Sequence, residues 1–184
     1  MKFIDTHHDT WHQAVGEDGP MQQPPVRANL LLTLEQWHAV RESWPAGLPT
    51  GVIVPNTVDI ETVAPDLPRL QLVALQFPKW IDGRAYSQAR LLRSRYRFAG
   101  EVRATGDVVV DMMPLLARTG FDAVQLRHDQ KQSSAERALN FFPGHYQGDL
   151  LQPQPAFARD LSADLAAQAA RKAQEAEQFV GQGI

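Results

Sequence analysis

The residues best suited to chemistry in this sequence are the lysine and arginines that gather between Lys79 and Arg103. This stretch holds seven basic and two acidic side chains, so its net charge is +5, whereas the rest of the chain carries −8. Guanidinium groups bind oxyanions such as sulfite, sulfate and phosphate through paired hydrogen bonds. The stretch therefore predicts a surface that binds a small oxyanion or a partner protein.

The position of this stretch in the predicted fold supports an anion site. A helix predicted over Gly83–Arg97 follows a strand predicted over Leu70–Phe77, so the helix should begin at the carboxyl edge of a sheet. Free backbone N–H groups at a helix start favour a negative charge. The candidate anion- or partner-binding residues are Lys79, Asp82, Arg84, Tyr86, Ser87, Arg90, Arg93, Arg103 and Asp107.

A plainer interpretation of the same residues stays open. Basic side chains on a helix commonly form a solvated face, and their aliphatic stems cover apolar surface. Asp82 could serve only as a cap for its helix, and Asp107 as the N-cap of the next one. His128 follows another predicted strand and could act as an acid or base, although an exposed loop histidine explains it equally simply.

The elements that must position these residues alternate between strands and helices. This alternation predicts a single α/β domain with a mostly parallel sheet, either open or partly barrel-like. The core strands are predicted at Gly51–Pro55, Leu70–Phe77, Glu101–Thr105 and Asp122–Arg127. Helices are predicted over Thr33–Ser43, with a Thr33–Gln36 capping box, and over Asp59–Leu67, Gly83–Arg97, Val108–Thr119 and Ser134–Phe142.

Both ends of the chain differ from this core. Lys2–Val15 is polar and predicts an edge strand or hairpin, followed by a turn at Gly16–Pro20. Pro114 should kink or split its helix, which Gly120 should end. The α/β domain is expected to cover residues 1–150, and residues 151–184 should form a helical extension in which the apolar residues are mostly alanine.

Composition excludes several classes of protein. The net charge of −3 argues against a nucleic-acid binder, and no apolar run approaches the roughly 20 residues of a membrane span. The absence of cysteine excludes disulfides and thiolate ligands and is compatible with the cytoplasm. No dinucleotide or P-loop motif occurs, and the cofactor is unknown. His7, His8, Asp9 and His12 would face both sides of a strand, so no metal site is predicted.

Several motifs resemble those of an uncharacterised bacterial family. Phe77–Arg95 reads FPKWIDGRAYSQARLLRSR, Gly100–Asp107 reads GEVRATGD, and Arg118–Ala123 reads RTGFDA. With His145–Gln147, the resemblance covers roughly Gly51–Gly148. Members of that family are described as probable oxidoreductases involved in sulfite reduction, encoded near the sulfite reductase haemoprotein. The chain departs from the pattern at VVVDMMP after Asp107 and at Thr119, where a cysteine is common in relatives.

The resemblance implies a place in sulfate assimilation and cysteine biosynthesis. It suggests an accessory protein of assimilatory sulfite reduction that binds an oxyanion or the sulfite reductase haemoprotein through the basic helix. One alternative is an oxidoreductase of sulfite reduction with a bound flavin or nicotinamide, since an electron carrier would have to come from a cofactor or a partner. The other alternative is a non-catalytic scaffold.

Overall fold

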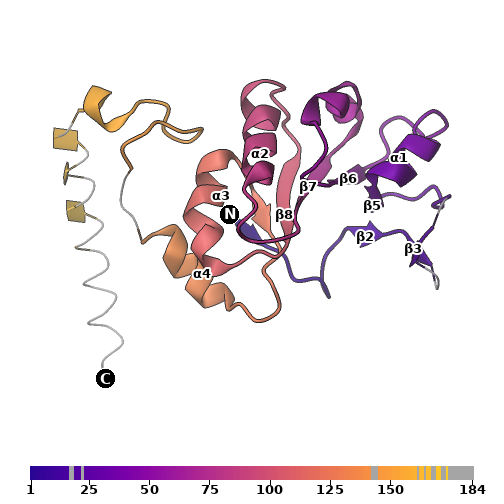
Figure 1. Cartoon of the computed structure of the whole chain (residues 1–184), viewed down its shortest axis with the longest axis horizontal. Coiled ribbons are helices and arrows are strands. Elements are labelled where there is room, and N and C mark those ends of the chain that lie inside the picture. Colours follow the sequence, from indigo (N-terminus) through magenta and orange to yellow (C-terminus); the bar gives the residue numbers. More distant parts are fainter. Residues whose placement is uncertain are drawn as a thin grey trace.

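A curved parallel sheet organises the molecule. The computed structural model describes residues 1–16, 19–21, 23–141 and 145–160, together with 162, 163, 165, 166, 169, 170 and 173. Within this part of the chain seven strands pair in the order β1-β9-β8-β7-β6-β5-β2, all parallel, and the sheet curves into half of a barrel (Figure 1). The strands are β1 (Lys2–Phe3), β2 (His12–Gln13), β5 (Leu30–Thr33), β6 (Thr50–Val54), β7 (Leu72–Phe77), β8 (Glu101–Gly106) and β9 (Ala123–Val124).

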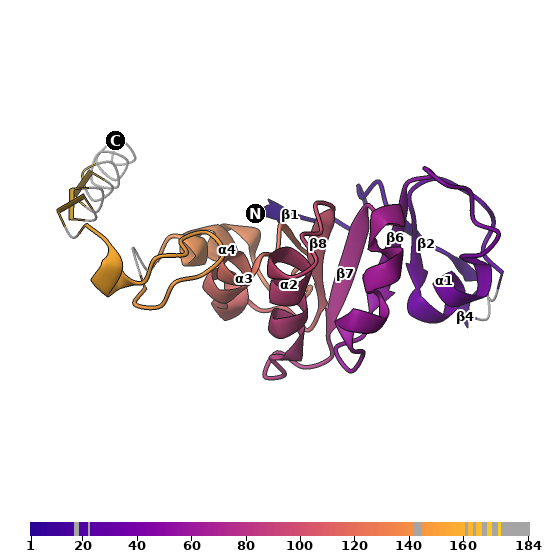
Figure 2. The ribbon, with the colours of Figure 1, turned by 90° about the horizontal axis from the view of Figure 1, so that it is seen from above.

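The helices cover the convex face of this sheet, as Figure 2 shows. Parallel strands need crossover connections, and helices packed on the sheet provide them. The α-helices are α1 (Leu34–Val40), α2 (Arg84–Ser94), α3 (Met113–Thr119) and α4 (Gln132–Leu139). Short 3-10 helices are η1 (Ile60–Thr62), η2 (Ala64–Arg69), η3 (Val110–Met112) and η4 (Ala156–Ala158), and a small hairpin pairs β3 (Val15–Gly16) with β4 (Gly19–Pro20).

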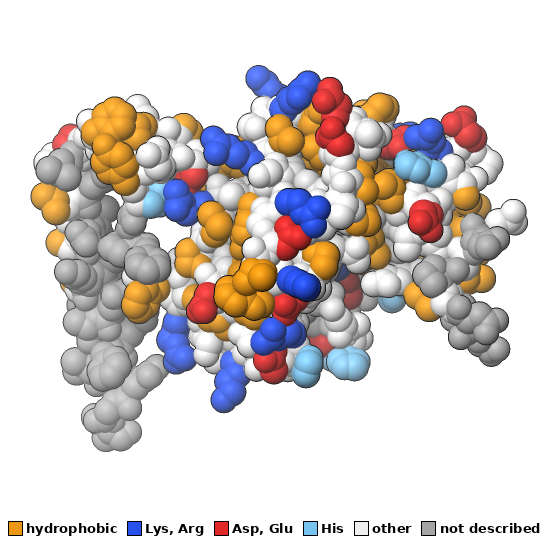
Figure 3. Space-filling model, in the orientation of Figure 1, with side chains coloured by type: hydrophobic (Ala, Val, Ile, Leu, Met, Phe, Trp, Pro, Cys, Tyr) orange, Lys and Arg blue, Asp and Glu red, His pale blue; other side chains and the backbone are white. Residues whose placement is uncertain are grey.

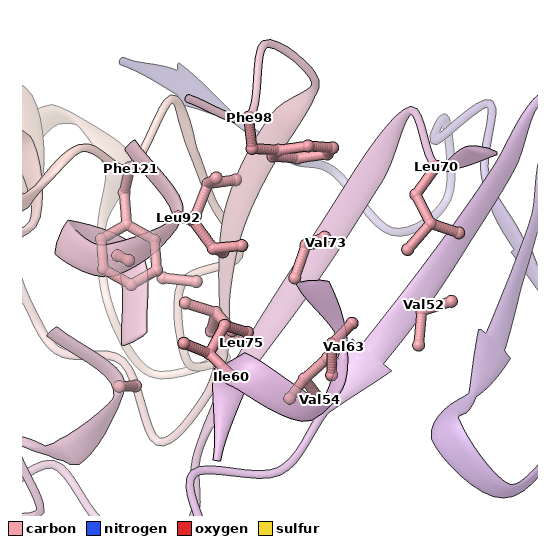
Figure 4. Packing of buried hydrophobic residues seen from close by; sticks show 14 of the residues in the cluster. Val52, Val54, Ile60, Val63, Leu70, Val73, Leu75, Leu92, Phe98 and Phe121 are labelled. Carbon is pink, nitrogen blue, oxygen red and sulfur yellow. The ribbon is translucent and has the colours of Figure 1, made fainter. Parts of the chain in front are cut away.

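The main hydrophobic core lies between the helices and the convex face. Alternate strand residues point to opposite sides of a sheet, so every second residue of β7 enters this core. Val73, Leu75 and Phe77 are fully buried there, and Figure 4 shows Val73 and Leu75 among their neighbours. Helix α2 adds Ala85, Ala89 and Leu92, and its alanines allow a close approach to the strands. The result is an apolar layer that holds α2 against the sheet.

The N-terminal segment covers part of the opposite, concave face. Strands β1 and β2 lie at the two edges of the sheet. Residues 4–11 connect them along the face that points away from the helices (Figure 2). Trp11 packs there on a small cluster formed by Leu31, Ile53, Leu72 and Ala74. The edge-strand prediction for Lys2–Val15 is confirmed, and β1 and β2 do not pair with each other because the whole sheet separates them. A short antiparallel pair, β3 with β4, forms at the predicted turn Gly16–Pro20.

Most other sequence predictions hold, with shorter bounds. The parallel α/β fold and its partial barrel shape are confirmed, and Thr33 and Gln36 form both bonds of the predicted capping box. Pro114 lies in the first turn of α3 and separates it from η3, and Gly120 ends α3 with φ 99°. The predicted helix Asp59–Leu67 is wrong in type, because this proline-containing stretch forms η1 and η2. Leu30–Thr33, to which no strand was assigned, forms β5.

The predicted C-terminal extension is described only in part. A helical extension was expected over residues 151–184. The described residues among 162–173 are helical, and residues 174–184 lie outside the described part of the chain. Just before it, Arg118 holds Asp149 through a 3.0 Å contact between Nε and Oδ2. The rings of Tyr146 and Phe157 lie 5.9 Å apart. The boundary at residue 150 stays a prediction.

Candidate functional site

The start of α2 already carries a carboxylate. Asp82 accepts hydrogen bonds from the backbone N–H of Arg84 at 3.3 Å and from its guanidinium Nη2 at 2.6 Å. These bonds from Arg84 hold the pKa of Asp82 well below its usual range. Asp82 therefore acts as a cap beside the N-cap residue Gly83, and it competes with any bound anion. Oxyanion binding at this helix start stays a prediction, and the contact between Asp82 and Arg84 argues against it.

Arg93 has a structural role at the other end of the helix. Its guanidinium donates to the backbone oxygens of Gly120 (3.0 Å), Gly100 (2.9 Å) and Phe98, and it pairs with Asp122. Gly100 and Asp122 precede β8 and β9, so these contacts lie at the amino edge of the sheet. Grouping Arg93 with the helix start is therefore wrong, because α2 runs antiparallel to the strands and carries it to the opposite edge.

Arg103 is also separated from the helix. Its side chain is 2% exposed and pairs with Asp9 and with Glu101, whose Oε1 lies 2.7 Å from Nη2. Arg103 lies on the concave face, because the same alternation that buries Val102 and Ala104 under the helices turns it away from them. Grouping Arg103 with α2 is therefore wrong. Sequence separation hid its partner Asp9, 94 residues away.

The remaining predicted residues divide between core and surface. The ring of Tyr86 packs on Phe77, with centroids 5.0 Å apart, and burial raises its pKa to about 12. Lys79, Ser87 and Arg90 are exposed, and none of the three forms an ion pair or side-chain hydrogen bond with another described residue. Figure 3 shows basic, acidic and apolar side chains interspersed over this face, without one continuous basic patch.

The loop between β7 and α2 exposes two large apolar side chains. Trp80 is 54% exposed and Ile81 is 70% exposed. The loop is nevertheless fixed, because the N–H of Trp80 donates to Asp107 Oδ2 at 2.9 Å and the N–H of Asp82 donates to the oxygen of Lys79 at 2.9 Å. Neither apolar residue was among the predicted site residues, although their place between Lys79 and Asp82 in a loop was a signal.

Asp107 has a different role from the predicted helix cap. Its second oxygen accepts from Arg127 Nη1 at 2.6 Å, and Arg127 also holds Asp129. The bond from the Trp80 N–H and then that from Arg127 lower the pKa of Asp107. The cap prediction is therefore wrong, since the carboxylate joins three loops at the carboxyl edge instead of closing the next helix.

A pocket with both polar and apolar lining occupies the concave face near the same edge. Gln76 of β7 lies opposite Thr105 of β8, and the N–H of Gln125, just after β9, bonds the oxygen of Ala104 at 2.9 Å. Their side chains, with Gln13, Thr33 and Glu35, line a pocket of about 420 Å³. The pocket could not be predicted from sequence, because the pairing register of the short strands was unknown.

Among the described residues, no group of three or more His, Cys, Asp or Glu side chains is placed so that it could hold a metal ion, and this includes the histidine-rich segment. Its members have other partners: His8 Nδ1 lies 2.6 Å from Asp5, and Asp9 pairs with Arg103. His128 is exposed in a loop.

These features define an α/β half-barrel protein with a fixed apolar loop at its carboxyl edge and an open pocket on its concave face. The chain belongs to the DUF934 family, bacterial proteins of unknown function, whose family model matches residues 51–157. This range agrees with the resemblance found over Gly51–Gly148. No curated protein matches the chain. No helix among the described residues has the length and apolarity needed to span a membrane.

Proposed function

We propose that the chain is an accessory protein of assimilatory sulfite reduction that docks on the sulfite reductase haemoprotein. The loop Lys79–Ile81 would provide the contact, with Trp80 and Ile81 as apolar anchors and Lys79 as a neighbouring positive charge. The resemblance of Phe77–Arg95 supplies the biochemical context of this proposal, and the exposed pair Trp80 and Ile81 is the observation that carries it.

Single exposed apolar residues are common on proteins and need no function. Here two large ones are adjacent, and hydrogen bonds to their loop fix the backbone that carries them. Tryptophan is enriched among the residues that dominate interface energy. A loop that is already ordered loses little conformational entropy on binding. Together these points favour a docking site for a protein over a site for a small oxyanion.

The basic residues contribute less to this proposal than sequence alone suggested. Arg84 is paired with Asp82, and Arg93 holds the amino edge together. Charge reversal at Arg93 would therefore damage the fold and cannot test binding. Among the basic residues predicted from sequence to bind an anion or a partner, Lys79 and Arg90 are exposed and form no ion pair with another described residue.

The test is the binding of the purified chain to the haemoprotein of the same organism, measured by biolayer interferometry. We expect Trp80→Ala with Ile81→Ala to weaken binding about 30-fold or more, since anchors of this kind contribute about 2 kcal/mol or more. Leu115→Ala is the matched control, because Leu115 is a 42% exposed apolar residue on α3. Its binding should equal that of the wild type.

Two outcomes would contradict the proposal: no binding by the wild-type chain, or equal binding by the double variant. Calorimetric titration with sulfite separates the oxyanion alternative. Saturable sulfite binding that Lys79→Glu with Arg90→Glu abolishes would favour that alternative and replace the docking proposal.

A further inference from the structure

The concave pocket has the chemistry of a small-molecule site that is separate from the docking loop. Its floor is made by Gln76, Thr105 and Gln125, which lie level on neighbouring strands at the carboxyl edge. Ligands of open α/β sheets and barrels bind at this edge. The volume of about 420 Å³ is within the range of cofactor and metabolite pockets.

Two glutamine side chains in this pocket lack a partner among the described residues, whereas three glutamines elsewhere in the fold are bonded. Gln36 binds two backbone oxygens, at 2.9 and 2.7 Å, and Gln88 binds two others, at 3.0 and 2.7 Å. Gln71 accepts from the N–H of Thr50. The half-buried side chains of Gln76 and Gln125 make no hydrogen bond with another described residue. They therefore offer donors and acceptors to a molecule in the pocket.

The charge of the pocket disfavours anions. Glu35 is the only charged residue among the described ones that line it. Arg103 lies one layer below Thr105 on the same face, where Asp9 and Glu101 balance its charge and that of Lys2. The Glu35 carboxylate lies above this balanced layer, so the unpaired charge that lines the pocket is negative and favours an ammonium group.

One wall of the pocket is apolar, with Leu31, Ile53 and Pro55, and the opposite side carries hydroxyl and amide groups. We propose that the pocket binds a small hydroxylated amine, whose ammonium group pairs with Glu35 and whose hydroxyl groups bond to Gln76, Thr105 and Gln125. This assignment is independent of the docking proposal, because the two surfaces share no residue.

Three sugars of one ring type test the assignment: glucosamine with a protonated amine, glucose as the neutral form and glucuronate as the anion. NMR titration of the ¹⁵N-labelled chain would follow the side-chain NH₂ signals of Gln76 and Gln125. We expect saturable shifts with glucosamine, an affinity for glucose about two- to fivefold lower, and no shift with glucuronate.

Variants identify the groups responsible. Glu35→Gln should lower glucosamine affinity to that of glucose and leave glucose unchanged, whereas Gln76→Met should abolish both. Ser87→Ala, on the helix side, is the control and should bind both sugars as the wild type does. The unliganded spectrum of each variant establishes that it is folded. The proposal is overturned if neither glucosamine nor glucose gives saturable shifts, if glucuronate binds as well as glucosamine, or if the folded Glu35 and Gln76 variants bind normally.

Discussion

Alternate residues of the same strands build the convex and concave faces of the sheet, and the two faces differ in chemistry. In β8, Val102 and Ala104 are fully buried under the helices, whereas Arg103 and Thr105 face the other side. The convex face is packed by four α-helices in the described chain, while the concave face is covered by residues 4–11 only in part. One face thus carries most of the apolar burial and the other carries polar groups.

The comparison shows how a small domain separates stability from binding. Apolar burial stabilises roughly in proportion to area, and the convex core holds most of that area. The concave face instead holds its covering segment through Trp11 and the ion pairs of Arg103. Buried charges need their partners, so this face should depend on a few contacts.

The largest effect is expected from breaking the charged layer of the concave face. Arg103→Ala should lower the free energy of unfolding by about 3–5 kcal/mol, because Asp9 and Glu101 would lose their buried counter-charge. Urea denaturation measures this loss. If the N-terminal segment depends on Arg103, proteolysis after its basic residue Lys2 should also become faster in the variant.

A matched variant separates charge from volume. Arg103→Met combined with Asp9→Asn and Glu101→Gln removes all three charges and keeps similar side-chain sizes, so it should regain a large part of the lost stability. A triple variant as unstable as Arg103→Ala would show that packing, and not an uncompensated charge, determines the loss.

The next effect compares one residue type on both faces of β5. Leu32 is fully buried in the convex core, and Leu31 is 5% exposed in the small concave cluster beside the pocket. We expect Leu32→Ala to cost about 3 kcal/mol and Leu31→Ala about half of that, since a site beside a pocket can relax or admit water. Thermal or urea unfolding measures both. Equal losses would contradict the assignment of the main core to the convex face.

How far sequence predicts this molecule depends on the range of each interaction. The capping box of Thr33 and Gln36 and the break at Pro114 arise within a few residues, and both were predicted. Long apolar strands such as β7 were found from their composition. The two-residue strands β1, β2 and β9 lie within segments predicted as strands, but their short bounds depend on the backbone groups that neighbouring strands present, which no local pattern marks.

The candidate sites were harder to predict for the same reason. The basic stretch was visible in the sequence, but its meaning depended on partners far along the chain. Arg93 bonds to backbone oxygens around Gly100 and Gly120, and Arg103 pairs with Asp9. The pocket required the register that sets Gln76 opposite Thr105. Charge density alone therefore identified a region but not the residues that are free to bind.

The smallest effect concerns the link between the sheet edge and the docking loop. Asp107→Asn should weaken the bond to the Trp80 N–H and the pair with Arg127, so hydrogen exchange at Trp80 should quicken about two- to fivefold. Asp129→Asn is the control, because Asp129 also binds Arg127 but does not contact Trp80. Exchange measured by NMR at Trp80 resolves this residue from the other three tryptophans.

The pH dependence of the wild type sharpens this last test. The pKa of Asp107 is lowered in the folded chain, so its contribution is fully present above the ordinary carboxyl pKa of about 3.9 and is lost as the pH falls through the lowered value. Protection of Trp80 should therefore hold from neutral pH down to that range and then decline, while Asp107→Asn shows faster exchange already at neutral pH. If Asp129→Asn exchanges as fast as Asp107→Asn, the pair with Arg127 orders the loop and the direct bond to Trp80 does not.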